Sequence, residues 1–224
     1  MMGTSTFVGS SQFGEKAKKY RRKFLFHAEA ILELLKEAYS AGCRGIHAVD
    51  AGKILEAAKT MKESYDDYII TGSSVPGQDP LIEGLFKAEA DVIFVHGSVS
   101  DKKDKQLISL AEEISSRGVI PGVAVHNPID TLKFVLKTMK KIDTFLVPIN
   151  KIGLYMGEKE KLEQLIDSHP QKYFIGMKTL AAGKLEPREA YEYISKHNIC
   201  ASAIGMVSPQ EVRLTTKIAL DSFK

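Results

Sequence analysis

The sequence predicts a (β/α)8 barrel, in which eight parallel strands alternate with helices. Apolar segments of about four to seven residues alternate with longer segments whose apolar residues recur at helical spacing, along the whole chain of 224 residues. Continuously apolar strands are typical of parallel strands covered on both faces. Eight such units in this length require short loops, and no shift in composition marks a second domain. Residues 1–224 are therefore expected to form one compact TIM barrel.

Glycine and proline set the expected boundaries. Gly42 and Gly118 are expected to end two helices, because glycine is common at helix C-caps. Pro128, Pro187 and Pro209 are expected to begin three others, because the first N–H groups of a helix have no intrahelical acceptor. The predicted strands are residues 4–8, 45–50, 68–71, 91–96, 119–126, 144–148, 173–178 and 199–205. The predicted helices are residues 27–41, 52–63, 80–90, 102–117, 128–140, 158–168, 187–197 and 209–223, with a turn at Pro76-Gly77. An open doubly wound sheet is the alternative, but no Gly-x-Gly-x-x-Gly turn supports it.

Composition excludes several classes of function. Hydrophobic residues make up 44% of the chain and the formal net charge is only +3. Lys and Glu mixed over the helical faces predict neither a nucleic-acid nor a membrane surface. No secretory pattern or long apolar run is present, and Cys43 and Cys200 lack metal-type spacing. We expect a cytoplasmic protein with two reduced, buried thiols that acts on a small molecule.

Polar residues gather where the predicted strands end. In a (β/α)8 barrel these carboxyl ends face the active-site mouth. The polar residues at these positions are Asp50, Thr71, His96, His126, Asn127, Asn150, Lys178 and Ser208. Imidazole, carboxylate and amine groups on one rim predict catalysis or metal binding.

His96 and His126 are candidates for acid–base catalysis, because histidine titrates near neutrality. A neutral ring nitrogen also binds Zn²⁺, and with Asp50 as a third ligand the two histidines would form a divalent-metal site open to water. Side chains alternate along a strand, so if Asp50 points into the barrel, His47 points toward the helices as a structural histidine.

Lys178 follows the apolar strand segment FIGM and would lie in apolar surroundings. Desolvation lowers the pKa of an amine, which suits Schiff-base or general-base chemistry. The same lysine suits two other roles, a fixed charge for a phosphate or carboxylate and a salt bridge to Asp50 or another rim acid.

The turns after strands seven and eight indicate an anion site. Gly183 and Gly205 precede helices that begin with proline, and backbone N–H groups at such turns bind phosphate in many barrels. Ser208 and Glu211 also match a helix capping box, so an ordinary cap is an equally good explanation.

The ordered motifs GIHAVDAGK, DVIFVHG, PGVAVHNP, MKTLAAGKL and SAIGMVSPQEV resemble the aldo/keto reductases over nearly the whole chain. That family consists of barrel enzymes that reduce carbonyl compounds with NADPH. The resemblance places the catalytic aspartate on Asp50 and the catalytic histidine on His96. The family's tyrosine falls on Leu55 and its lysine on Gly72, so two of the four catalytic positions are not matched. Ordinary reductase chemistry lacks its proton donor here.

The resemblance also implies a cofactor phosphate site at the strand-eight turn, formed by Gly205, Ser208 and Arg213. Lys217 is a second substitute for the lysine that this segment usually carries in the family. Lys178 would lie near the nicotinamide.

Three hypotheses follow. The first is a small-molecule enzyme that works through Asp50, His96, His126 and Lys178, with an anionic ligand at the strand seven and eight turns and NADPH as the implied cofactor. The second is a metal-dependent lyase, isomerase or hydrolase, and the third a non-catalytic barrel that binds a metabolite or partner. Four aromatic residues of the N-terminal arm are expected either to pack onto a second subunit or to plug the bottom of the barrel. They are Phe7, Phe13, Phe24 and Phe26.

Overall fold

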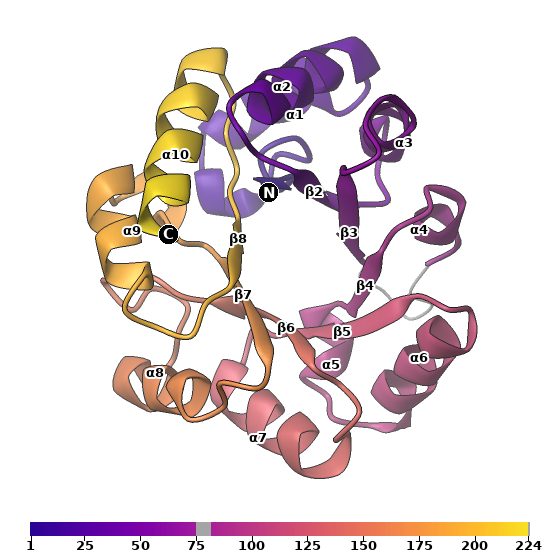
Figure 1. The fold of residues 1–224 in the computed structure, drawn as a ribbon, viewed down its shortest axis with the longest axis vertical. Helices are drawn as coiled ribbons and strands as arrows, with labels where there is room; N and C mark the ends of the chain where they lie inside the picture. The colour runs from indigo at the N-terminus through magenta and orange to yellow at the C-terminus, as the bar shows by residue number, and fades with distance from the viewer. Residues whose placement is uncertain (75–81, 224) are drawn as a thin grey trace.

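Eight parallel strands form one sheet in the computed structural model, which describes residues 1–74 and 82–223 (Figure 1). The strands are β1 (Met2–Gly3), β2 (Gly45–Val49), β3 (Ile69–Ser73), β4 (Val92–Val95), β5 (Ile120–Ala124), β6 (Thr144–Pro148), β7 (Tyr173–Met177) and β8 (Ala201–Ala203). Each strand pairs in parallel with the next, and a bridge between Met2 and Ile204 joins β8 to β1. The predicted (β/α)8 barrel is confirmed.

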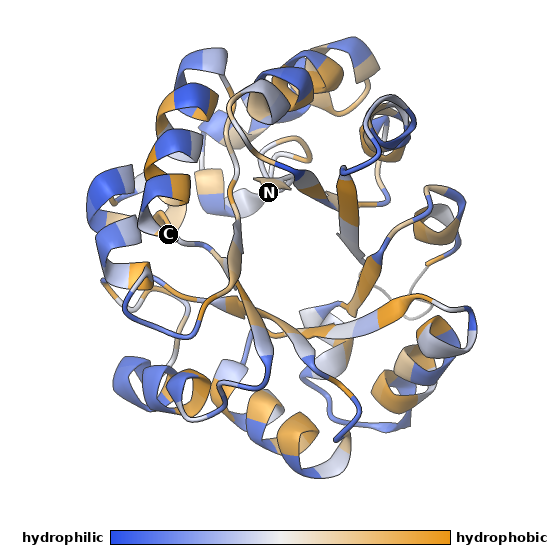
Figure 2. Ribbon diagram, in the orientation of Figure 1, coloured by the Kyte–Doolittle hydropathy of each residue, from blue (hydrophilic) through white to orange (hydrophobic). Residues whose placement is uncertain are grey.

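Helices surround the strands. They are α1 (Lys16–Phe24), α2 (Ala28–Ser40), α3 (Ile54–Ser64), α4 (Glu83–Lys87), α5 (Gly97–Ser100), α6 (Lys105–Ser116), α7 (Pro128–Thr138), α8 (Lys159–Asp167), α9 (Pro187–Ile194) and α10 (Pro209–Ser222), with 3₁₀ turns η1 (Ser11–Phe13) and η2 (Ala181–Gly183). Figure 2 shows hydrophilic residues on the outer faces of the helices and hydrophobic residues along the strands. This is the amphipathic pattern from which the fold was predicted.

Two apolar clusters show which way the strand residues point. The larger cluster lies between the sheet and the helices and includes Ile46 and Ala48 of β2. The smaller cluster lies inside the barrel. It consists of Phe94, Ala124, Leu146, Ile175 and Ala203. The ring of Phe94 fills the space beside Gly122, where an added Cβ would lie 2.5 Å from it. The small residues at the ends of β5 and β8 leave the interior open at the carboxyl end of the barrel.

The N-terminal region differs most from the prediction. Residues 4–8 are not a strand, because their backbone forms turns in which the N–H groups of Phe7 and Val8 both donate to the carbonyl of Thr4. The first strand is instead the two-residue β1. Helices α1 and α5 were not predicted, and the predicted helix 80–90 is the shorter α4, its start lying outside the described residues together with the Pro76-Gly77 turn.

The aromatic residues of the N-terminal arm lie on the carboxyl side of the barrel, since they follow β1. Phe7 and Phe24 are fully buried against each other, with ring centroids 4.9 Å apart. Phe13 packs edge-on against Tyr20, and Phe26 is exposed. The arm therefore does not plug the bottom of the barrel. Of the two cysteines, Cys43 is buried as predicted, whereas Cys200 is exposed.

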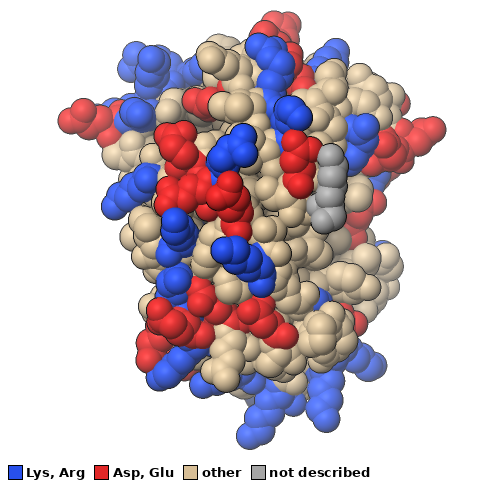
Figure 3. Space-filling view, turned by 60° about the vertical axis from the view of Figure 1, so that its left-hand side comes forward, with Lys and Arg blue, Asp and Glu red and all other residues tan. Residues whose placement is uncertain are grey.

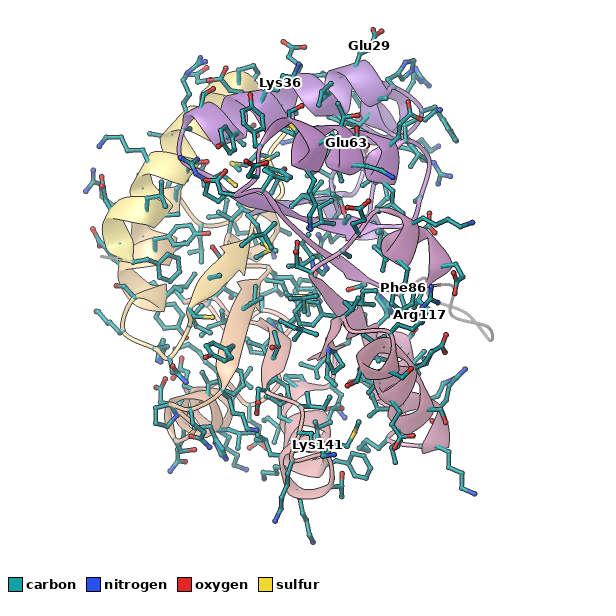
Figure 4. The ribbon with its side chains drawn as sticks, turned by 45° about the vertical axis from the view of Figure 1, so that its right-hand side comes forward. Glu29, Lys36, Glu63, Phe86, Arg117 and Lys141 are labelled. Atoms are coloured by element: carbon teal, nitrogen blue, oxygen red, sulfur yellow. The ribbon has the colours of Figure 1, made fainter. Side chains whose placement is uncertain are left out.

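Charged side chains link neighbouring helices on the outside. Acidic and basic residues are intermixed on the face drawn in Figure 3. Between α4 and α6, the Arg117 guanidinium lies 3.4 Å from the centroid of the Phe86 ring and also pairs with Glu83 (Figure 4). Among the helices of the described residues, none is both long enough and apolar enough to cross a membrane.

Gly52, at the start of the turn before α3, tests the packing of α1 against the barrel. Its φ is +55°, and an added Cβ would lie 2.0 Å from the carbonyl oxygen of Leu25, just after α1. We expect Gly52→Ala to lower the free energy of unfolding by about 3 kcal/mol, from backbone strain and steric overlap together. Gly118→Ala is the matched control, because Gly118 has φ +79° but no neighbour within 4 Å of the added Cβ. Urea unfolding that gave equal losses for the two variants would contradict this account.

Candidate active site

A cavity of about 1250 Å³ opens at the carboxyl end of the barrel. Its walls come from residues of β2 and β3 and from the carboxyl ends of β1, β4, β5, β6, β7 and β8 with the segments that follow them. The chemically active side chains on these walls include His47, His96, His126, Tyr155 and Lys178, with Ser5, Thr6 and Ser73 as nearby hydroxyls. Three of the four predicted catalytic residues therefore share one cavity.

His96 and His126 form a pair at the ends of β4 and β5. Their ring centroids lie 4.9 Å apart and their rings are nearly perpendicular. Gly97 allows this approach, because a Cβ there would lie 2.7 Å from the ring of His126. The backbone N–H of Ser98 donates to Nδ1 of His96 at 3.2 Å. Neutral His96 therefore carries its proton on Nε2, the nitrogen left to donate to a ligand.

Lys178 directly follows β7 and adopts a left-handed backbone, with φ +58°. This conformation costs a non-glycine residue about 1 kcal/mol and persists only where neighbours enforce it. The Asn150 amide supplies part of that enforcement by donating to the Lys178 carbonyl at 3.3 Å and to the Leu154 carbonyl at 2.8 Å. The Nζ of Lys178 lies 4.4 Å from the ring centroid of Tyr155, a cation–π contact.

Asp101, directly after α5, holds the backbone that follows β5. Its Oδ2 accepts from the backbone N–H groups of His126 at 3.0 Å and Asn127 at 2.9 Å. Its Oδ1 accepts from the hydroxyl of Thr131 at 2.8 Å. One carboxylate thus fixes the turn between β5 and α7 that carries His126.

The electrostatics of the cavity favour neutral bases. Burial, and then the neighbouring His126, lower the pKa of His96 to about 4. Burial also lowers the pKa of Lys178, and the charge of Asp101 opposes this shift. His126 is exposed overall, yet burial of its ring, with the charge of Lys178, lowers its pKa below the usual value. At neutral pH both imidazoles are free bases, and the amine loses its proton more readily than an ordinary lysine.

His47 points into the barrel, so its predicted direction toward the helices is wrong. Its Nδ1 lies 3.0 Å from the Thr71 hydroxyl and its Nε2 lies 3.0 Å from the Ser73 hydroxyl. Both ring nitrogens are therefore engaged, which agrees with the structural role expected for this histidine. Burial, followed by the charges of His96 and the N-terminal amine, lowers its pKa to about 4.

Asp50 lies outside the cavity. Side chains do alternate along β2 as predicted, but with the opposite phase, because Ile46 and Ala48 belong to the core beneath the helices. A Cβ on Gly84 of α4 would lie 1.9 Å from the carboxylate of Asp50, which places that carboxylate on the helix side of the sheet. The structure therefore does not bring Asp50 together with His96 and His126. In residues 1–74 and 82–223, no group of three His, Cys, Asp or Glu side chains is arranged to hold a metal ion.

The residues predicted for anion binding divide into two pairs. Gly183 and Gly205 line the cavity. Ser208 does not line it and caps α10, accepting from the N–H of Glu211 at 3.3 Å. Arg213 turns away and pairs with Glu37 of α2 at 2.9 Å. The anion site expected at the β8–α10 turn therefore receives no charge from Arg213.

Sequence reasoning missed two residues that shape the site. Asp101 and Tyr155 lie in connections beyond the strand ends, where no periodicity assigns a direction. A signal for Tyr155 was available in the segment NKIGLYMG, whose glycines indicate a tight turn, since Gly153, Tyr155 and Gly157 all have positive φ. No comparable signal identifies Asp101.

The fold and the cavity define the chain as a (β/α)8 barrel with a polar site at the carboxyl ends of its strands. No protein-family model matches the sequence, and none of the curated proteins matches it. A putative aldo-keto reductase from Pseudomonas aeruginosa is structurally similar at TM-score 0.71 and 15% identity, covering 100% of this chain and 89% of that one. An aldo-keto reductase from Bacillus halodurans, in its holo form, has TM-score 0.66 and 15% identity, covering 86% and 82%.

A second group of similar structures contains aldolases. The 2-keto-3-deoxy-6-phosphogluconate aldolase of Zymomonas mobilis, solved with 3-phosphoglycerate, has TM-score 0.58 and 15% identity, covering 87% of both chains. The chain thus has the barrel fold of the aldo-keto reductases, and the predicted resemblance to them is confirmed at the level of fold. Identities this low leave the activity to be argued from the site.

The charge of Asp101 can be tested with Asp101→Asn. The amide keeps an oxygen for the backbone N–H groups but removes the negative charge that raises the pKa values of His96, His126 and Lys178. We expect the pKa of both histidines to fall further, as measured by NMR titration of their ring protons. Asp104→Asn, which removes a carboxylate that caps α6 three residues away, is the control. Unchanged histidine pKa values in Asp101→Asn would refute this role of the carboxylate.

Proposed function

We propose that the protein is an enzyme acting on the carbonyl group of a small anionic compound, through a Schiff base on Lys178. One observation carries the proposal: the Lys178 amine, with its lowered pKa, shares a cavity with the two neutral imidazoles of His96 and His126. An unprotonated amine is the nucleophile for a carbonyl carbon, and neutral imidazoles are suited to move protons beside it.

The chemistry follows from these groups. The Lys178 amine attacks the carbonyl carbon, a C–N bond forms, and loss of water gives a protonated imine. The electron pair of an adjacent C–H or C–C bond then moves toward the imine nitrogen and forms an enamine. When a C–H bond breaks, an imidazole accepts its proton; when a C–C bond to a hydroxyl-bearing carbon breaks, an imidazole accepts the hydroxyl proton and that carbon leaves as an aldehyde. Protonation of the enamine carbon and hydrolysis of the imine release the product and return the free amine. The class is therefore a lyase or isomerase of carbonyl compounds.

Each histidine has its own part in this scheme. His96 presents Nε2–H and suits donation to the carbonyl oxygen as water is lost. His126, held by Asp101 through its own backbone and that of Asn127, suits proton transfer at the carbon. The aromatic ring of Tyr155 holds the ammonium form of Lys178 beside the cavity between turnovers.

Reductive trapping tests the proposal. The protein is incubated with pyruvate, glyceraldehyde 3-phosphate or dihydroxyacetone phosphate, reduced with borohydride, and digested for mass spectrometry. The expected result is an adduct on the peptide containing Lys178, with much less on Lys184, an exposed lysine of the same turn. Labelling spread equally over Lys178 and the exposed lysines would argue against an imine-forming site.

Carbonyl reduction with NADPH is the second candidate. It is favoured by barrels of higher structural similarity, which include a putative aldo-keto reductase and a mutant of Gox0644 solved in complex with NADPH. The Nε2–H of His96 would polarise the carbonyl, and the turns at Gly183 and Gly205 would face the cofactor. Fluorescence titration with NADPH separates the two candidates: saturable binding without borohydride labelling of Lys178 would favour reduction.

A further inference from the structure

Helix α1 carries most of the unbalanced charge of the protein. Residues 15–24, EKAKKYRRKF, contain six cations and one acid in a chain whose formal net charge is only +3. In the described part of the chain, none of these six cations takes part in an ion pair, whereas Lys62 of α3, Lys159 of α8 and Arg213 of α10 do. The positive charge is therefore concentrated on one helix, contrary to the even spread predicted from the sequence.

This helix lies at the mouth of the candidate active site and beside α2 (Figure 1). Lys16 and Tyr20 line the main cavity. Four further cations of α1, Lys18, Lys19, Arg22 and Lys23, border a second hollow together with Glu15. This hollow is shallow and open to solvent, because its lining side chains are exposed and come from this one segment. A ligand that leaves the cavity past Lys16 would therefore meet these cations next.

Helix α1 also supplies charge where sequence reasoning expected it from α10. Two basic residues of α10 were candidates for binding an anion at the β8–α10 turn, but both form ion pairs, Arg213 with Glu37 and Lys217 with Asp221. Lys23 reaches that turn instead, since its Nζ donates to the carbonyl of Val207 at 3.1 Å. The two elements are thus joined at the edge of the cavity.

We infer that the second hollow binds the polyphosphate group of a ligand whose other end enters the cavity. The four cations from Lys18 to Lys23 extend over about 8 Å of the helix axis, which is comparable with two or three linked phosphates rather than one. The apolar side of α1 is turned inward, with Phe24 buried and Tyr20 packed against Phe13, so little remains for insertion into a membrane. This inference rests on the proposed function only for the reaction of the ligand's carbonyl group with Lys178 inside the cavity.

Calorimetric titration with inorganic tripolyphosphate, and with ATP as a nucleotide probe, tests the inference. Replacing Lys18, Lys19 and Arg22 together with alanine should weaken binding of both by about 10-fold or more, since three exposed charges are lost. The matched control replaces Lys133, Lys137 and Lys140 on and just after α7, removing the same charge elsewhere. Wild-type affinity should also fall as salt rises.

The outcomes separate cleanly. The inference would be overturned if tripolyphosphate affinity fell equally in both triple variants, or did not fall in the α1 variant. It would also be overturned if the protein bound a long oligonucleotide or an anionic vesicle tightly but did not bind tripolyphosphate. Trapping of pyruvate on Lys178 should be unchanged in the α1 variant, because pyruvate carries no phosphate. If trapping fails in the wild type while the α1 variant loses tripolyphosphate affinity, the proposed function fails and the polyphosphate site stands.

Discussion

Replacing Lys178 with methionine is expected to abolish turnover, by at least about 1000-fold, for whichever carbonyl compound labels the wild-type protein. Methionine fills similar space but has no amine to form the imine. The measurement is exchange of the substrate's α-hydrogens with deuterated water, followed by NMR. Lys184→Met, in the same turn but exposed, should exchange at the wild-type rate. Residual exchange in Lys178→Met within 10-fold of the wild type would rule out a Schiff base at this residue.

Replacing His96 or His126 should affect the reaction differently from replacing Lys178. With His126→Gln the amine and His96 both remain, so borohydride trapping should persist, while hydrogen exchange should slow by about 100- to 10,000-fold. A structural role of His126 alone would instead lower trapping and exchange together. His96→Gln should slow imine formation, and with it both trapping and exchange, because His96 is assigned to the loss of water.

Acid is expected to destabilise the fold between about pH 6.5 and pH 4. His47 and His96 have folded-state pKa values of about 4, below the value of about 6.5 in an unfolded chain. Below pH 6.5 the unfolded state binds protons that the folded state refuses, so the free energy of unfolding falls as pH falls and levels off below about pH 4. For His47, which is partly buried at the cavity wall, the loss is at most about 3 kcal/mol, with a further contribution from His96.

Denaturant unfolding at a series of pH values measures this loss. His47→Gln should reduce the slope in the window from pH 6.5 to pH 4, because glutamine does not titrate and still offers a donor and an acceptor to Thr71 and Ser73. His27→Gln, at an exposed histidine before α2, should leave the slope unchanged. Stability that stayed constant across this window in the wild type would contradict the inward, desolvated position of His47.

Local pattern was sufficient for the fold and for part of the site. The order of apolar strands and amphipathic helices is a property of the chain read residue by residue, and a parallel strand order follows from it. Because every parallel strand ends at the same side of the barrel, His96, His126 and Lys178 were expected together before any distance was known.

The local sequence pattern could not determine which side chains of β2 point into the barrel. Alternation along β2 fixes that Asp50 and His47 point to opposite sides, but which of them enters the barrel depends on the register of β2 against β1 and β3. Burying Ile46 and Ala48 beneath the helices selects the register in which His47 turns inward and meets two hydroxyls. The same choice removed Asp50 from the site and, with it, the three-residue metal site.

What the sequence by itself determined is the barrel and the three strand-end residues, because each depends on spacing along one chain. Only the tertiary structure decided that Asp101 holds His126, that Tyr155 faces Lys178, and that α1 rather than Arg213 charges the β8–α10 turn. The reason is physical: each is a contact between segments whose mutual distance is set by how the helices and loops pack around the closed sheet, and no periodicity within a segment encodes it.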